Sequence, residues 1–170
     1  MTNLIAAESP GQAEEGQKET PKSARTTGIP IYRVTLVQEG KVRRTRKRLR
    51  DSAAASRMFR RYLADVDREH FVVLLLDRKN QVIGINTVSI GSLTASIIHP
   101  REVFKPAILS NAAAVICGHN HPSGDPQPSE EDRAITKRLV ESGEMLGIAV
   151  IDHIIVGETT YFSFADQGLM

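Results

Sequence analysis

The stretch AAAVICGHNHPSGDPQPSEED, residues 112–132, joins an apolar run to two histidines and a loop rich in Pro and Gly. Residues 112–117 predict a buried strand that ends at the following glycine. Side chains alternate along a strand, so His119 and His121 point the same way from its end. The loop cannot be helical, and it returns Asp132 in the first turn of the next helix. Two imidazoles and a carboxylate suit Zn²⁺, and three protein ligands leave a fourth position for water, as in catalytic sites.

The same residues resemble the signature of the JAMM (MPN+, JAB) metalloproteases, which combines a distant Glu with His-x-His-x10-Asp and a Ser in Ser-x-x-Asp. Within that superfamily the stretch is similar to the RadC branch, and the resemblance runs from about residue 69 to 168, through His99–Lys105 and Asp152–Gly157. It implies a cytidine-deaminase-like MPN/JAB fold of the α/β class. It also implies a zinc-dependent hydrolase that cleaves a peptide or isopeptide bond with a metal-activated water.

Two glutamates are candidates for the general base that takes the proton of the attacking water. Glu69 comes just before the apolar run 71–76, which matches the place of the JAMM glutamate at the start of the first core strand. Glu102 is the rival, but it stands in the first turn of an expected helix, where acidic residues are favoured anyway. Ser129 is expected to cap the helix that follows it. The resemblance implies that its hydroxyl also supports the oxyanion of the tetrahedral intermediate.

Other polar residues near the motif have ordinary structural interpretations. Asp125 lies between Gly and Pro and is interpreted as a turn residue. His153, in an apolar run, is either a satisfied, half-buried histidine, which we favour, or a residue that orients a ligand. Cys117 is expected to be a buried, inert thiol. As the single cysteine it excludes an internal disulfide and fits a reducing cytoplasm. No stretch nears the ~20 apolar residues of a membrane span.

Composition separates the start of the 170-residue chain from the rest. Residues 1–28 contain no aromatic residue and few aliphatic ones, which predicts a disordered tail. Residues 29–170 predict a single domain in which helices flank a mixed sheet. Residues 31–37 alternate like a strand, and a turn at Glu39-Gly40 would make residues 29–50 a basic hairpin extension. The remaining periodicities predict helices at 52–66, capped by Ser52, at 100–111 and at 129–146, and strands at 71–76, 82–90, 112–117, 148–156 and 161–164.

Seven of the 22 basic residues lie within ten positions: Lys41, Arg43, Arg44, Arg46, Lys47, Arg48 and Arg50. Such a run either protects an edge strand from aggregation or binds phosphates without sequence preference. The RadC resemblance supplies the alternative function, an accessory protein in DNA repair or mobile-element biology that contacts nucleic acid. RadC proteins also have an N-terminal helix-hairpin-helix segment, and residues 1–50 show no such pattern, which weakens this alternative. A metal-free scaffold is opposed by the complete ligand set.

Overall fold

The computed structural model describes residues 29, 31–41, 48–91 and 98–170. Contacts divide the chain into residues 1–33 and residues 34–170, and all helices and strands of the described residues belong to the second unit. In chain order they are α1 (Ser52–Tyr62), β1 (His70–Leu76), β2 (Val82–Ile90), α2 (Pro100–Leu109), β3 (Ala114–Asn120), α3 (Glu130–Leu146), β4 (Ala149–Val156) and β5 (Tyr161–Ser163). None of these helices is long and apolar enough to cross a membrane.

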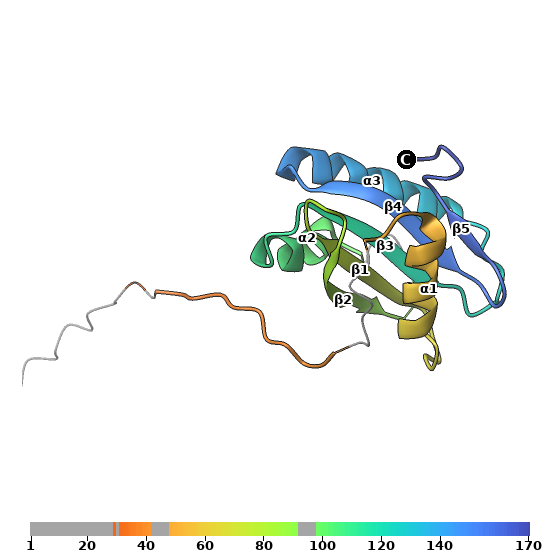
Figure 1. The fold of residues 1–170 in the computed structure, drawn as a ribbon, viewed down its shortest axis with the longest axis horizontal. Helices are drawn as coiled ribbons and strands as arrows, with labels where there is room; N and C mark the ends of the chain where they lie inside the picture. Colours follow the sequence, from red (N-terminus) through yellow and green to blue (C-terminus); the bar gives the residue numbers. More distant parts are fainter. Residues whose placement is uncertain (1–28, 30, 42–47, 92–97) are drawn as a thin grey trace, which may run out of the picture. The chain divides into compact units, whose positions relative to one another are not determined.

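The strands form one mixed sheet in the order β2-β1-β3-β4-β5 (Figure 1). The central strand β3 runs antiparallel to β1 and parallel to β4, and the outer pairs β1–β2 and β4–β5 are antiparallel. Helix α3 connects the two parallel strands, because such strands need a long crossover. The predicted α/β class with a mixed sheet and flanking helices is therefore confirmed.

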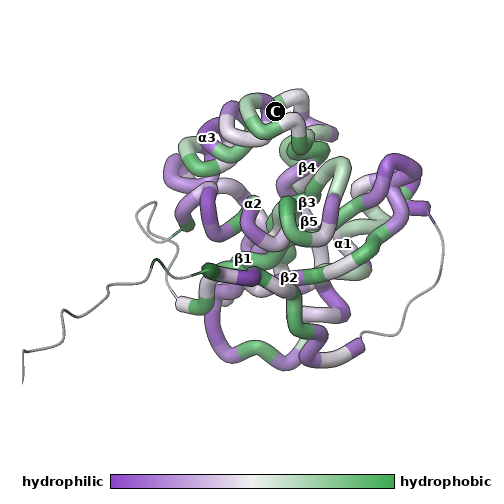
Figure 2. Tube along the Cα trace, turned by 90° about the vertical axis from the view of Figure 1, so that its left-hand side faces the viewer, coloured by the Kyte–Doolittle hydropathy of each residue, from purple (hydrophilic) through white to green (hydrophobic). Residues whose placement is uncertain are grey.

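Hydrophobic side chains cover both faces of the sheet, which explains the continuous apolar runs at residues 71–76 of β1 and 114–117 of β3. On one face, Phe71, Val73 and Leu75 of β1 pack with residues of α2 and α3. On the other face, the alternate residues of β1 pack with Phe59 and its neighbours in α1. Helices therefore lie on both sides of the sheet, as Figure 1 shows. Figure 2 shows that hydrophilic and hydrophobic residues alternate around α3.

Several boundaries differ from the sequence-based expectations. Strand β3 continues to Asn120, because β1 pairs with it through His119 and β4 pairs with it through Asn120. Helix α1 is capped by Asp51 rather than Ser52, since the Asp51 carboxylate accepts a hydrogen bond from Ala54 N at 2.7 Å. The same helix ends at Tyr62, four residues early, before two aspartates that would oppose the helix dipole at a C-terminus.

The strand predicted at residues 31–37 is wrong. Residues 31–41 contain neither helix nor strand, and apolar side chains such as Ile31, 99% exposed, bury nothing. An alternating pattern stabilises a strand only where a partner strand and an apolar surface meet it. The second strand of the predicted hairpin falls mainly on residues 42–47, which lie outside the described residues together with the tail 1–28.

Candidate metal centre

Three segments that are distant in sequence meet at one end of the central strands. His119 lies near the end of β3 and is fully buried, and His121 follows that strand directly. Strand β1 is antiparallel to β3, so its start lies beside the end of β3, with Phe71 paired to His119. Glu69 precedes β1 and thereby reaches the histidines. Asp132 joins them from the first turn of α3.

The donor atoms of these side chains are close enough to share one ion. His119 Nε2 lies 3.0 Å from His121 Nε2 and 3.1 Å from Asp132 Oδ1, and His121 Nε2 lies 3.5 Å from Asp132 Oδ2. Tetrahedral zinc with bonds of ~2.0–2.1 Å would hold its ligand atoms roughly 3.3 Å apart. One donor atom each of Glu69, His119 and His121 lies within 4.8 Å of the others, so these residues could also hold a metal ion. Glu69 Oε1 is 3.8 Å from His119 Nε2, farther than the carboxylate of Asp132.

A hydrogen bond at the other ring nitrogen orients His121. Its Nδ1 lies 2.7 Å from the backbone carbonyl of Asp125, and a carbonyl can only accept. The neutral ring therefore carries its proton on Nδ1 and presents the Nε2 lone pair to the cluster. Asp125 Oδ1 accepts from Gln127 N at 3.0 Å, so its side chain shapes the loop. The interpretation of Asp125 as a turn residue agrees with this contact, while its carbonyl serves the site.

The electrostatics of the cluster favour a bound cation. Burial opposes ionisation of Asp132, but its contacts with the two motif histidines and Ser129 hold its pKa well below the usual range. The neighbouring Asp132 carboxylate in turn raises the pKa of His121. Positive charge between the rings and the carboxylate, from a proton or a metal ion, stabilises their approach to within about 3.0–3.5 Å. The donor set therefore fits a metal ion.

Ser129 and Asp132 form the capping box that begins α3. Ser129 Oγ accepts from Asp132 N at 3.1 Å, and Asp132 Oδ2 accepts from Ser129 N at 2.8 Å. The Ser129 hydroxyl also donates to the same carboxylate oxygen at 2.6 Å. The predicted N-cap is confirmed, and these bonds fix the orientation in which Asp132 faces the histidines.

Glu69 is held from both sides by the asparagine between the motif histidines. Asn120 Nδ2 donates to Arg68 O at 3.0 Å, and Asn120 Oδ1 accepts from His70 N at 2.9 Å. The Glu69 carbonyl also accepts from Gly91 N at 2.8 Å. The backbone around Glu69 is thus tied to β3 and to the end of β2. The sequence analysis did not predict this role of Asn120, although the position of Asn120 between the two motif histidines could have indicated it.

The rival Glu102 lies in the first turn of α2, and it does not belong to the group of described residues whose donor atoms converge. Its carboxylate pairs with Lys105 Nζ at 2.6 Å and with Arg101 Nε at 3.3 Å. The hydrogen bond from Lys105 is the largest cause that holds the pKa of Glu102 below its usual value, and the charges of Lys105 and Arg101 act in the same direction. The geometry therefore favours Glu69 over Glu102 as the carboxylate that works beside the histidines.

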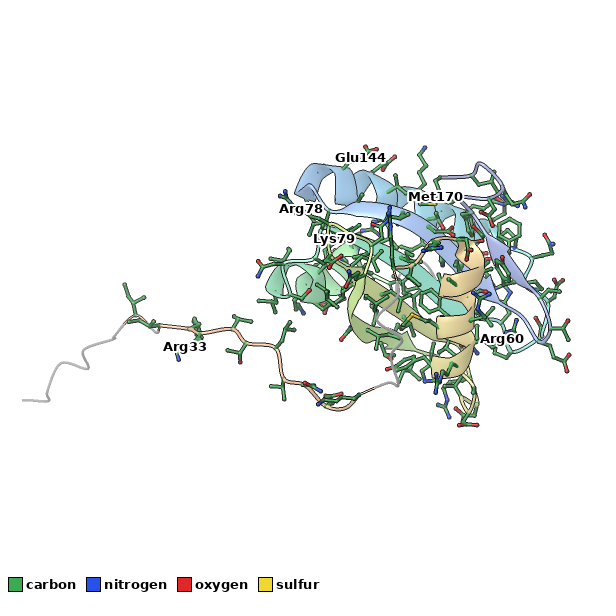
Figure 3. The ribbon with its side chains drawn as sticks, viewed as in Figure 1. Arg33, Arg60, Arg78, Lys79, Glu144 and Met170 are labelled. Atoms are coloured by element: carbon green, nitrogen blue, oxygen red, sulfur yellow. The ribbon has the colours of Figure 1, made fainter. Side chains whose placement is uncertain are left out.

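The loop between the histidines and α3 rests on the β4–β5 turn. His121 N donates to Val156 O at 3.1 Å, and Glu158 N donates to Gly124 O at 2.9 Å. A Cβ at Gly157 would collide with the Gly124 carbonyl, so the two backbones touch. Arg60, which Figure 3 labels beside α1, donates to three carbonyls of this turn at 2.6–3.0 Å. Helix α1 therefore supports the loop that carries His121.

Cys117 and Asp152 contribute to the fold. Cys117 is fully buried, and burial raises the pKa of its thiol to about 12, as expected for an inert core cysteine. Asp152 accepts from Ser163 Oγ at 2.7 Å and from Ala165 N at 3.0 Å, which fastens the C-terminal turn to β4. His153 instead faces the cluster: its Nε2 lies 2.9 Å from His119 Nδ1. Of the two interpretations of His153, the one in which it orients a ligand therefore fits the structure better.

Fold and donor cluster together define an α/β domain of the JAB type with a candidate metal site. The family profile of the RadC-like JAB domain matches residues 49–169, and the chain belongs to this family, a member of the JAMM superfamily. A UPF0758 protein of Desulforamulus reducens is 56% identical over 108 residues, which cover 64% of this chain and 48% of that protein. A UPF0758 protein of Trichlorobacter lovleyi is 54% identical over 126 residues, 74% of this chain and 55% of its own length. The chain thus spans about half the length of the curated relatives it matches.

Proposed function

We propose that this domain is a zinc-dependent hydrolase that cleaves an amide bond, in a peptide or an isopeptide, with an activated water. His119, His121 and Asp132 would hold the ion. Bound zinc lowers the pKa of a coordinated water and polarises the carbonyl of the substrate. The observation that carries the proposal is the convergence of two imidazole Nε2 atoms and an ionised carboxylate at mutual distances of 3.0–3.5 Å.

Glu69 serves as the general base in this proposal. Its Oε1 is 3.8 Å from His119 Nε2, so the carboxylate would lie near a water that the bound ion holds. The carboxylate accepts the proton of the water as it attacks and returns that proton to the leaving amine. The side chain is 18% exposed, and its backbone is anchored by Asn120 and Gly91, which limits its movement.

Ser129 supports the oxyanion of the tetrahedral intermediate. Its hydroxyl hydrogen is engaged by Asp132 Oδ2 at 2.6 Å, so it must turn from that oxygen to donate to the substrate. Asp132 would share its negative charge with a bound ion, which would weaken that hydrogen bond and make the rotation easier. Since Ser129 also caps α3, a Ser129→Gly variant separates the roles: glycine is a tolerable N-cap but has no hydroxyl.

The decisive experiment combines metal content with turnover. The purified protein should bind about one Zn²⁺ per chain, and His121→Ala should lose it after chelation and reconstitution. On a substrate found by screening a peptide and isopeptide library, Glu69→Gln should retain zinc and lose ~10²–10⁴-fold in rate. Glu102→Gln is the matched control and should change the rate far less. Equal zinc content in wild type and His121→Ala would refute the site, and unchanged turnover in Glu69→Gln would refute the base.

The compartment proposed with this function is the cytoplasm, because a single buried thiol suits a reducing environment. The alternative, contact with nucleic acid in DNA repair or mobile-element biology, depends on the basic run. Lys41, Arg48 and Arg50 are its described members, and all three are exposed.

A further inference from the structure

A chain of buried hydrogen bonds leads from His119 through His153 and Thr136 back to Asp132. His119 Nδ1 lies 2.9 Å from His153 Nε2, and His153 Nδ1 lies 2.6 Å from Thr136 Oγ1. Thr136 Oγ1 is also 2.6 Å from the backbone carbonyl of Asp132. All four residues are at most 2% exposed, so water does not compete for these contacts.

The carbonyl at one end of this chain fixes the direction of every bond. The Asp132 carbonyl can only accept a hydrogen bond, so the Thr136 hydroxyl donates its one hydrogen to this carbonyl. Thr136 Oγ1 must then accept from His153 Nδ1–H, which leaves His153 Nε2 without a proton in the neutral ring. His153 Nε2 therefore accepts from His119 Nδ1–H, and His119 Nε2 is left with its lone pair toward His121 and Asp132.

We propose that His153 and Thr136 are positioning residues that hold His119 in its Nδ1–H tautomer, with Nε2 ready to bind metal. The inference rests on the proposed metal site. The relay begins at the ring of one candidate ligand and ends at the backbone of another, so it fixes β3, β4 and α3 relative to one another at the cluster. Hydrogen bonds of this kind orient metal-binding histidines and raise their basicity.

Packing holds His153 in place for this role. Its ring stacks on Phe164, with centroids 5.1 Å apart and planes 11° apart, and meets the edge of Phe71 at 5.4 Å. Phe71 also stacks on His119 at 6.0 Å. Two aromatic neighbours and two hydrogen bonds leave the His153 ring little freedom to rotate. The ring therefore transmits the direction of the Thr136 bond to His119.

Thr136→Val tests the relay, because valine keeps the shape of threonine and removes the hydroxyl. His153 Nδ1–H then loses its acceptor, so the His153 proton should move to Nε2 and force the His119 proton onto its own Nε2. Zinc affinity, measured by competition with a chromophoric chelator, should fall ~10–100-fold. Thr136→Ser retains the hydroxyl and is the matched control, with affinity close to wild type.

Long-range ¹H–¹⁵N correlation spectra of the metal-free protein read the tautomers directly. The five histidines can be assigned by single substitutions. Wild type and Thr136→Ser should show Nδ1–H on His119 and His153, and Thr136→Val should show Nε2–H on both. A wild-type His119 that carries a proton on Nε2 and none on Nδ1 would overturn the proposal. Because these spectra need no metal, a wild type that binds no zinc would refute the proposed function and leave the relay to be judged by the tautomers.

A second pair of variants serves if Thr136→Val does not fold, which circular dichroism would reveal. His153→Gln provides a side-chain oxygen that can accept from His119 Nδ1–H, whereas His153→Leu provides none. The glutamine variant should bind zinc at least ~10-fold more tightly than the leucine variant. Equal affinities of these two folded variants would overturn the relay.

Discussion

Replacing Gly118 by alanine should destabilise the domain, because helix α1 presses directly on the strand beneath the donor cluster. A Cβ at position 118 would lie 2.6–2.7 Å from three ring atoms of Phe59. Phe59 is fully buried in the cluster that joins α1 to the sheet, so its ring has no open space into which it can move. The added methyl group must displace either the helix or β3.

The size of the effect follows from the overlap. Carbon atoms in good contact lie ~3.5–4.0 Å apart, so the ring and the new methyl group must separate by about 1 Å. Overpacking of a filled core costs ~1–3 kcal/mol, and an overlap with three rigid ring atoms belongs in the upper half of that range. At ~2–4 °C per kcal/mol for a domain of this size, Tm should fall by about 4–12 °C.

Thermal and urea unfolding followed by circular dichroism measure this loss, since the chain has no tryptophan for fluorescence. Gly40→Ala is the matched control, because a Cβ at Gly40 meets nothing within 4 Å and its φ is not positive. In a Phe59→Leu background the alanine at 118 should cost at least ~1 kcal/mol less, since the smaller side chain relieves the overlap. A Tm for Gly118→Ala equal to that of Gly40→Ala, or strictly additive effects in the double variant, would refute the reasoning.

Three further outcomes are expected. Asn120→Ala removes two hydrogen bonds beside Glu69, so it should lower the free energy of unfolding by ~1–3 kcal/mol and reduce the turnover per bound zinc. The control Asn111→Ala, outside the cluster, should leave the turnover per bound zinc unchanged, and an unchanged value in Asn120→Ala would contradict the anchoring role. At pH 8, Cys117 should react with a thiol reagent ~10³-fold more slowly in the native protein than in the protein unfolded by urea, because burial raises its pKa from 9.0 to about 12 and so depletes the thiolate. Equal reaction rates would contradict the burial of Cys117. If the basic run binds DNA, the affinity should fall steeply as the salt concentration rises. Replacing Arg43, Arg44, Arg46 and Lys47 by glutamine should abolish the binding and leave the zinc content unchanged. Binding that does not depend on salt would exclude phosphate contacts as its cause.

Local patterns predicted the elements that carry strong local signals. The β2 bounds follow from alternation and turn residues, and α3 begins at a capping serine and ends at Gly147, whose φ of 68° suits glycine. The strand expected at residues 31–37 failed because alternation does not reveal whether a partner exists. Strand β3 continues beyond its predicted end at residue 117, because the neighbouring strands β1 and β4 pair with polar residues that the apolar pattern did not include.

The candidate site could be predicted in part, because its spacing is local while its support is not. The separation of His119, His121 and Asp132 along the chain is enough to place them together across one strand end and one helix start. Their support comes from Thr136 on α3 and His153 on β4, whose contact depends on how α3 packs against the sheet. Sequence periodicity identifies that an α3 face is buried, but it does not identify which polar residue that face brings against which partner.

Asp132 links the stability of α3 to the occupancy of the candidate centre. Its carboxylate satisfies the Ser129 N–H at the helix start, its carbonyl ends the relay from His119, and its Oδ1 lies 3.1 Å from His119 Nε2. Without a metal ion, the Asp132 carboxylate raises the pKa of His121, so a proton can supply positive charge between them. A metal ion would take the place of that proton while the capping bonds remain. The residue that begins the helix therefore makes the fold of this segment and the binding of metal mutually stabilising.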